Sequence, residues 1–248
     1  MRKIVRLIIV ASITAALSVA LVLVAVYQAS RQVPEFYRQA LTAAPAAEQE
    51  GGQRFEQQAL ALHNQLHHAG HWEIRFTQDE INGWLAADLP AKFPRLLPAG
   101  VSEPRIAIDD DLLRVAVHYQ RGGMDTVASL TGHVQLTDQP NEIAVRIDQA
   151  RAGAVPVPLA RFLQEIAERA ARADIPLRWT EAKGAPVALV RVPLETKDAR
   201  HQLVLERFDV RDGEFIVSGR TENESSDDAS KESPVTANQP PDSDTRQR

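Results

Sequence analysis

Residues 71–85, HWEIRFTQDEINGWL, contain the sharpest local signal in the sequence. The first six residues alternate between apolar and polar, which is typical of a half-buried strand. The hydroxyl of Thr77 can then accept the backbone N–H of Glu80, and the Glu80 carboxylate can accept that of Thr77, which makes a capping box at a helix start. Phe76 and Ile81 flank the box as a hydrophobic staple. The stretch therefore predicts a strand that passes directly into a short capped helix.

Further alternating segments follow between residues 104 and 147. In each one, apolar residues recur at every second position, and turn sequences such as 109–111 and 138–141 separate the segments. Alternating strands joined by short turns predict an antiparallel meander with one buried and one solvent-facing side. A further hairpin is predicted within residues 201–220, with Asp-Gly at positions 212–213 as its turn.

The clearest amphipathic helix is predicted from Leu159 to Ala173, where apolar residues form a wide stripe. Such a stripe must lie on another apolar surface, and the apolar side of the meander is available. Prolines punctuate the segments 174–184 and 187–194, for which we expect loops, edge strands or irregular apolar chain. The predicted fold class is α+β: an N-terminal transmembrane helix, then a curved antiparallel sheet packed against one long amphipathic helix and one short capped helix.

Residues 7–27, LIIVASITAALSVALVLVAVY, hold no charged residue across 21 positions. A helix of that length reaches roughly 30 Å, the thickness of a bilayer's hydrocarbon core. Arg2, Lys3 and Arg6 precede the run, and basic residues favour the cytoplasmic side. We therefore predict a single-pass signal anchor in the inner (cytoplasmic) membrane, with the N-terminus inside and the C-terminal domain periplasmic or extracellular. The alternative is a signal peptide cleaved at a small-residue site near residues 28–30.

The sequence is predicted to comprise four parts. They are a cytoplasmic stub and transmembrane anchor (1–30), a juxtamembrane helical segment (31–70), an exported α+β domain (71–220) and a disordered acidic tail (221–248). Within the second part, the Ala-, Pro-, Glu- and Gly-rich residues 42–53 indicate a linker, and residues 54–69 have a helical pattern that ends at Gly70.

The formal net charge of the 248 residues is −5, and it is unevenly distributed. Residues 222–248 hold seven acidic and three basic residues, which gives −4 there and leaves −1 for the rest. A nearly neutral body argues against nucleic acid as a partner, because nucleic-acid binding needs a concentrated basic surface. The sequence has no cysteine, which excludes disulfides, thiol catalysis and cysteine–zinc sites.

Motifs for catalysis or phosphate binding are absent from the sequence. GxSxG, SxxK, GxxxxGK[ST] and GxGxxG do not occur. His63 and His67 have the i, i+4 spacing of two metal ligands, but no third ligand follows at a defined offset, so a solvated helix face is favoured. We therefore predict no enzyme activity, no catalytic or metal-binding residues and no cofactor.

One resemblance rests on the residues from Phe76 to Leu85, FTQDEINGWL, which have the form F-T-x-x-E-I/L-N-x-x-L. A meander follows, then a Gly-x-x-Pro-x-Pro segment at 153–158 and an amphipathic helix. Over residues 72–219 the sequence resembles the YpmS-like family of membrane-anchored bacterial proteins and, more loosely, the tubular lipid-binding domains. The resemblance implies a lipid-facing or envelope role without enzyme activity. The sequence departs from the family pattern in residues 32–70 and in its acidic tail.

The functional expectation follows from the helix and the sheet together. If they do not pack fully, an apolar groove between them would suit an acyl chain. We therefore expect an exported domain that binds lipid or another apolar envelope component beside the membrane bilayer. The candidate lipid-contact residues are Trp84, Leu85, Phe162 and Ile166, and the alternative for all four is a closed core. The alternative function is a non-catalytic structural or scaffolding protein of the envelope, with a protein partner bound at a sheet edge or helix.

Overall fold

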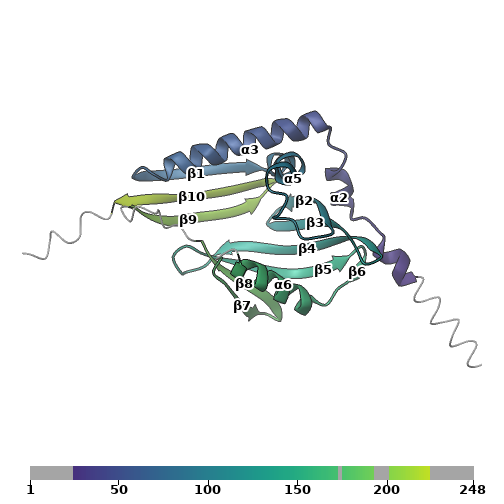
Figure 1. The fold of residues 1–248 in the computed structure, drawn as a ribbon. Helices are drawn as coiled ribbons and strands as arrows, with labels where there is room; N and C mark the ends of the chain where they lie inside the picture. The colour runs from purple at the N-terminus through teal and green to yellow at the C-terminus, as the bar shows by residue number, and fades with distance from the viewer. Residues whose placement is uncertain (1–24, 173–174, 193–200, 224–248) are drawn as a thin grey trace, which may run out of the picture.

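The computed structural model describes residues 25–172, 175–192 and 201–223. These residues form two antiparallel sheets with helices around them (Figure 1). In chain order the elements are α2 (Glu35–Ala40), α3 (Pro45–Gln65), β1 (Gly70–Thr77), α4 (Gln78–Gly83), a π-helical turn (Trp84–Asp88), α5 (Leu89–Lys92), β2 (Val101–Asp109), β3 (Leu112–Arg121), β4 (Met124–Leu136), β5 (Glu142–Ala152), β6 (Val155–Pro156), α6 (Leu159–Arg172), β7 (Leu177–Ala182), β8 (Ala185–Arg191), β9 (His201–Arg211) and β10 (Glu214–Asn223).

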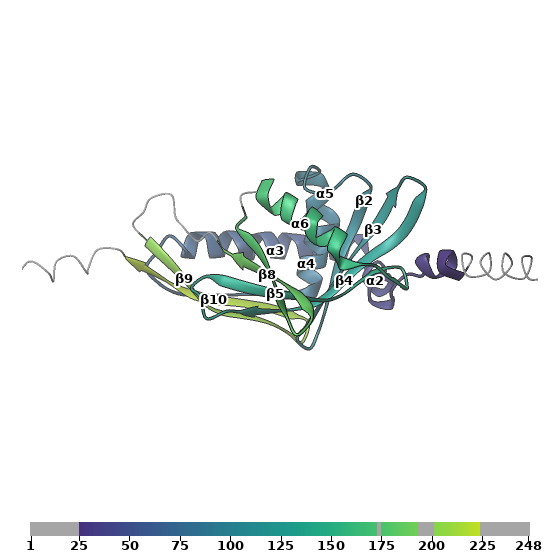
Figure 2. The same cartoon turned by 90° about the horizontal axis from the view of Figure 1, so that it is seen from below.

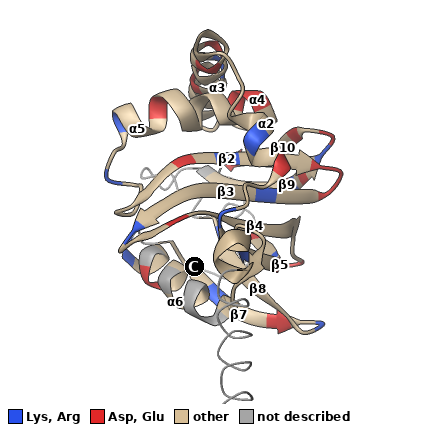
Figure 3. Ribbon diagram, turned by 90° about the vertical axis from the view of Figure 1, so that its right-hand side faces the viewer, with Lys and Arg blue, Asp and Glu red and all other residues tan. Residues whose placement is uncertain are grey.

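Sheet A has the strand order β1-β10-β9, and sheet B has the order β2-β3-β4-β5-β8-β7, with β6 paired to β5. Helix α3 lies along sheet A (Figure 1 and Figure 2), and α6 packs beside β7 of sheet B. Seen from the side, α3, α4 and α5 cover the β2 end of the molecule, whereas β7 and α6 lie at the other end (Figure 3). Helices α3 and α4 therefore pack at β1 and β2, whereas α6 packs at β7.

The core lies where sheet A meets the apolar face of sheet B. Val210 of β9 forms a buried cluster with Ile106 and Ile108 of β2, and Phe208 packs against it. The strands of sheet B supply this face because successive side chains of a strand point to opposite sides. A second buried cluster joins sheet A to β5 and consists of Trp72, Ile143, Leu203 and Leu205.

The predicted capping box is confirmed, and the helix that it starts holds the edge of sheet B. Thr77 and Glu80 exchange the two capping hydrogen bonds. One turn further on, Asn82 Nδ2 donates to the carbonyl of Ile106 (3.0 Å), and the N–H of Ile106 donates to Asn82 Oδ1 (2.8 Å). Gln78 Oε1 accepts the N–H of Ile108 (2.7 Å). Because β2 is an edge strand, these side chains satisfy buried backbone groups that would otherwise lack a partner.

Helices α3 and α4 cross at three glycines. A Cβ added at Gly83 would lie 2.5 Å from the carbonyl oxygen of Glu48 and 2.7 Å from the backbone nitrogen of Gly52. A Cβ at Gly51 would lie 2.9 Å from the carbonyl oxygen of Asp79. The two helix backbones are therefore closer than any side chain would permit, and this contact fixes α4 over β2.

The fold class predicted from the sequence, with a transmembrane helix and one curved sheet, is wrong. The described residues contain more strand than helix, and they form two sheets. Among them, no helix has both the length and the apolar composition needed to cross a membrane. The single-pass and signal-anchor description is therefore not supported. Residues 7–24 of the predicted span 7–27, and residues 224–248 of the predicted tail, lie outside the described part of the chain.

Two local predictions are also corrected. The longest described helix is α3, which begins at Pro45 and includes most of the predicted linker 42–53. The segments 174–184 and 187–194 contain the β7–β8 hairpin, whose turn residues Lys183 and Gly184 have φ of 54° and 78°. β7 is an edge strand, as one of the expectations for 174–184 had it, whereas β8 lies between β5 and β7 and is not an edge strand. This hairpin extends sheet B beyond β5. The predicted meander and the hairpin at 212–213 are confirmed as β2–β5 and β9–β10.

Tyr37 of α2 is the most deeply buried large side chain described, with 2% of its surface exposed. It packs against Ala116 and Val127, and its hydroxyl donates to the carbonyl of Glu103 (2.9 Å). Burial, followed by the nearby Glu103 carboxylate, raises the pKa of Tyr37 to about 12. The folded state therefore keeps this proton at pH values where the unfolded chain, with a pKa of 10.0, has lost it.

We expect the contribution of Tyr37 to stability to be complete below pH 10 and to disappear as the pH rises to 12. Its slope approaches about 1.4 kcal/mol per pH unit in that window. Tyr37→Phe should cost about 1 kcal/mol at pH 7, through the lost hydrogen bond, and should remove this part of the alkaline loss. Urea unfolding of both proteins at pH 7, 9 and 11 measures the difference. Equal losses between pH 9 and 11 would contradict the assignment.

Candidate functional site: an apolar groove under helix α6

A groove of about 230 Å³ lies between α6 and the apolar face of sheet B. Strands β3, β4, β5, β8 and β7 supply its floor and sides, and Ile166 of α6 supplies its cover. Side chains of Leu, Val, Ile, Ala and Trp make up almost the whole lining, and Thr131 is its one hydroxyl residue. The groove therefore offers an apolar surface with very few polar atoms.

The strand register explains why the floor is hollow. One row across the sheet runs Val134, Val145, Ala188, Trp179, so a small alanine lies between larger residues. Gly132, at a bulge in β4, adds no side chain to the next row. A Cβ there would collide with the backbone carbonyl of Arg146, so the sheet backbone itself requires glycine. Small residues at both places leave space that their neighbours do not fill.

Helix α6 covers this space without closing it. Among its side chains that the structure describes, Leu163, Ile166 and Ala167 are only half-buried, and Ala170 is buried. Its contacts with the sheet are made mainly with β7. A helix that filled a closed core would bury its central apolar residues completely. The packing of α6 thus differs from that of a core helix.

Trp179 carries a buried polar atom at the side of the groove. Its indole Nε1–H is shielded from solvent and has no hydrogen-bond acceptor among the described residues. A buried donor without a partner costs free energy, about 1–3 kcal/mol in typical proteins. The same ring also borders a neighbouring cavity of about 540 Å³ that Leu159 and Leu163 line. Trp179 therefore borders both the groove and this cavity, and its indole N–H is available to donate to a ligand.

The four candidate residues from the sequence do not lie together. Ile166 lines the groove. Trp84 stacks between Phe55 and Phe93, with ring centroids 5.4 and 6.1 Å away, and Leu85 packs against the buried cluster of β2 and β9. The side chain of Phe162 lies outside the described residues. Sequence reasoning missed Trp179 because the prolines around its strand concealed the alternation of 177–182.

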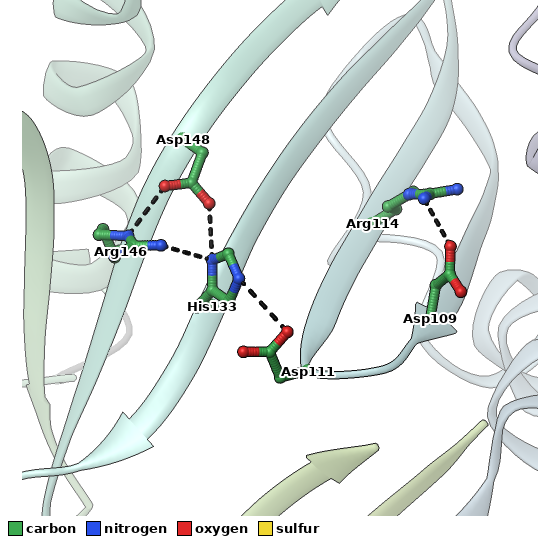
Figure 4. A network of polar contacts seen from close by, with 6 residues as sticks. All are labelled: Asp109, Asp111, Arg114, His133, Arg146 and Asp148. Carbon is green, nitrogen blue, oxygen red and sulfur yellow. Dashed lines mark hydrogen bonds and ion pairs between the residues drawn. The ribbon is translucent and has the colours of Figure 1, made fainter. Parts of the chain in front are cut away.

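The opposite face of sheet B is polar, and one network on it connects β4 and β5 with the turn between β2 and β3 (Figure 4). His133 lies 2.7 Å from Asp148 through Nδ1 and 3.6 Å from Asp111 through Nε2. Arg146 also binds Asp148, at 2.8 Å. The members of this network contain no hydroxyl or thiol nucleophile. In the described part of the chain, no group of three or more His, Asp or Glu residues could hold a metal ion.

A second polar arrangement lies nearer the strand ends. Ser102 Oγ is 3.3 Å from His118 Nδ1, and His118 Nε2 is 2.8 Å from Asp125 Oδ1. Sequence reasoning did not find this set because the register of β2, β3 and β4 brings it together. All three side chains reach solvent, Glu103 competes for the same histidine nitrogen at 4.0 Å, and none of them lines the groove. Polar pairs of this kind are ordinary on the wet face of a sheet.

Comparison of the chain with protein-family models, curated proteins and solved structures gives no significant match. The resemblance to the YpmS-like family therefore stays a prediction. What the structure defines is a class of domain: two antiparallel sheets with an apolar groove that one amphipathic helix covers incompletely.

Proposed function

We propose that the protein binds an apolar ligand, an acyl chain or a group of similar width, in the groove under α6, and that it does so without catalysis. The observation that carries the proposal is the apolar lining of the groove together with the half-buried α6 above it. Lipid and other small-ligand sites are mostly apolar, with few polar groups that orient the ligand. The indole N–H of Trp179 would be such a group, because a carbonyl or carboxyl oxygen of the ligand could accept it.

The driving force would be the removal of apolar surface from water on both partners, at roughly 25 cal/mol per Å². A chain in the groove would also give Ile166, which is only half-buried, further apolar contacts. A ligand site differs from a closed core in one measurable way: its space must accept a ligand of suitable width.

A groove-filling substitution tests the proposal. Val190 points into the groove from β8, and Leu189 follows the opposite face of the same strand. We expect the full chain to bind 11-(dansylamino)undecanoic acid saturably and dodecanoic acid to displace it. Val190→Phe should weaken binding about tenfold or more, which equals a loss of about 1.4 kcal/mol. Leu189→Phe adds a ring of the same size outside the groove and should leave binding unchanged. Unfolding curves of both variants check that they fold.

Two results would overturn the proposal. One is wild-type protein that shows no saturable fluorescence change. The other is an equal loss of affinity in both variants, which would mean that the probe binds elsewhere or that either ring disturbs the fold.

A second candidate function, the scaffolding role, has one observation in its favour. β7 is the last strand of sheet B, so its outer edge pairs with no strand in the described structure. A partner peptide could add there as a further strand. Alternate side chains of the peptide would then lie beside Leu177 and Trp179 on the apolar face of sheet B. Reproducible cross-linking of a partner at β7, with no binding of the fatty-acid probe, would favour this function over the first.

A further inference from the structure

A second pocket, of about 340 Å³, lies on the polar face of sheet B. The segment 32–36 borders it on one side, and strands β3, β4 and β5 form its floor. Its polar lining comes from Gln32, Arg114, Ser129, Thr131, Gln149 and Arg151. Two of these side chains are cationic and none is a carboxylate, so within the described lining the pocket favours a negative charge.

The strand register builds this lining from two adjacent rows. Arg114, Thr131 and Gln149 lie opposite one another on β3, β4 and β5. The next row on the same face contains Ser129 and Arg151. The two arginines thus lie on either side of β4, and their strands are about 10 Å apart. Their long side chains can both reach a group held over the two hydroxyls.

The two arginines and the two hydroxyl residues of the lining have hydrogen-bond donors that a ligand could use. Arg114 donates to Asp109 Oδ2 at 2.7 Å (Figure 4), and its guanidinium lies 5.9 Å from the ring centroid of Phe36. These contacts position the guanidinium and leave further N–H donors. Within the described part of the chain, Arg151 has no carboxylate partner, and the side chains of Ser129 and Thr131 make no hydrogen bond. The pocket therefore holds donors that the protein does not itself satisfy.

We infer that this pocket binds a phosphate group, as a soluble phosphate monoester or as the headgroup of a phospholipid. Guanidinium groups match phosphate through pairs of parallel N–H···O bonds, and hydroxyl and carboxamide donors suit the remaining oxygens. A bare ion would not fill 340 Å³, so the alcohol part of an ester also has room. Because neighbouring residues of a strand face opposite sides, this site and the apolar groove lie on opposite faces of sheet B. The proposal of a phosphate site and the proposal of an apolar-ligand site can therefore be disproved independently of each other.

The test uses one charge removed from the pocket and one removed elsewhere. Arg151→Gln takes a cation from the lining, whereas Arg121→Gln takes a cation, also exposed, from the same sheet outside the lining. Calorimetric titration of the full chain with glycerol 3-phosphate and inorganic phosphate measures the soluble arm. Flotation with phosphatidylcholine vesicles containing phosphatidic acid, against phosphatidylcholine alone, measures the lipid arm.

We expect wild-type binding in at least one arm, weakened about tenfold or more by Arg151→Gln and unchanged by Arg121→Gln. Binding in the soluble arm identifies a free ester as a sufficient source, and binding confined to phosphatidic acid vesicles identifies the headgroup. The inference is overturned if neither arm shows binding. It is also overturned if the two variants weaken binding equally, because that would be unspecific attraction of anions.

Discussion

Glu48→Ala is expected to lower the free energy of unfolding by about 3–5 kcal/mol, because it leaves the charge of Arg105 buried and unpaired. Arg105 Nη2 binds Glu48 Oε1 at 2.9 Å, and the residue is only 5% exposed. Its Nη1 donates to the carbonyl of Pro104, and its Nε has no partner in the described structure. Among the residues that the structure describes, Glu48 therefore supplies the carboxylate that compensates this guanidinium, and it joins α3 to β2.

Glu50→Ala is the matched control for this change. Glu50 lies in the same helix and also binds an arginine, Arg54, at 2.6 Å, but its side chain is 70% exposed. Exposed pairs of this kind contribute about 0–1 kcal/mol. Urea unfolding at pH 7 should therefore separate the two variants by about 2 kcal/mol or more. Equal losses would mean that water reaches Arg105 and that its burial does not matter.

Gly83→Ala is expected to destabilise the protein by about 3 kcal/mol, against the ordinary preference of helices for alanine. The new methyl would overlap the carbonyl of Glu48 and the backbone nitrogen of Gly52, and neither can move without separating α3 from α4. That movement would also pull Asn82 away from β2. In a helix with free space, the same substitution would stabilise by up to about 1 kcal/mol, so the sign of the change is itself diagnostic.

Gly52→Ala provides a comparison within the same contact. Its Cβ would meet first the side-chain carboxylate of Asp88, which can rotate away, and then the carbonyl of Gly83 at 3.3 Å. We expect it to cost less than Gly83→Ala, and we expect Asp88→Ala to recover part of the loss when the two changes are combined. Thermal or urea unfolding of the four proteins gives the order. A stabilised Gly83→Ala variant would disprove the close helix crossing.

The two proposed ligand sites lie on opposite faces of sheet B. The apolar groove uses the residues that alternate toward α6, and the proposed phosphate pocket uses the residues between them; Thr131, at the bulge in β4, borders both. An amphiphile could not span both through the sheet. Binding of the fatty-acid probe and binding of phosphate should therefore be independent, and simultaneous titration with both measures this directly.

Several elements could be predicted from the sequence because short-range chemistry decides them. The capping box of Thr77 and Glu80 needs only residues three apart, and the Asp-Gly turn of β9–β10 needs only two neighbours. Alternation predicted β2 to β5 because side chains of a strand change sides at each residue. The apolar stripe of residues 159–172 predicted α6, including Ile166 on its buried side.

Predictions from short sequence patterns were wrong where residues distant in the sequence decide the structure. Gly51 and Gly52 favour a linker by their own propensity, yet they lie within α3 because α4 packs directly on them. Trp84 and Leu85 satisfy the pattern of an apolar site, yet Trp84 packs between two phenylalanines and Leu85 packs against the β2–β9 cluster.

The sequence by itself determined the strands β1 to β5, β9 and β10, the capped helix and the two-sided character of sheet B, since periodicity and capping act over a few residues. Only the tertiary structure decided that β7 and β8 join β5, that Ala188 and Gly132 lie under α6, and that Arg114 and Arg151 share a pocket. The physical reason is strand register: it sets which residues, far apart in the chain, become neighbours, and no local pattern encodes it.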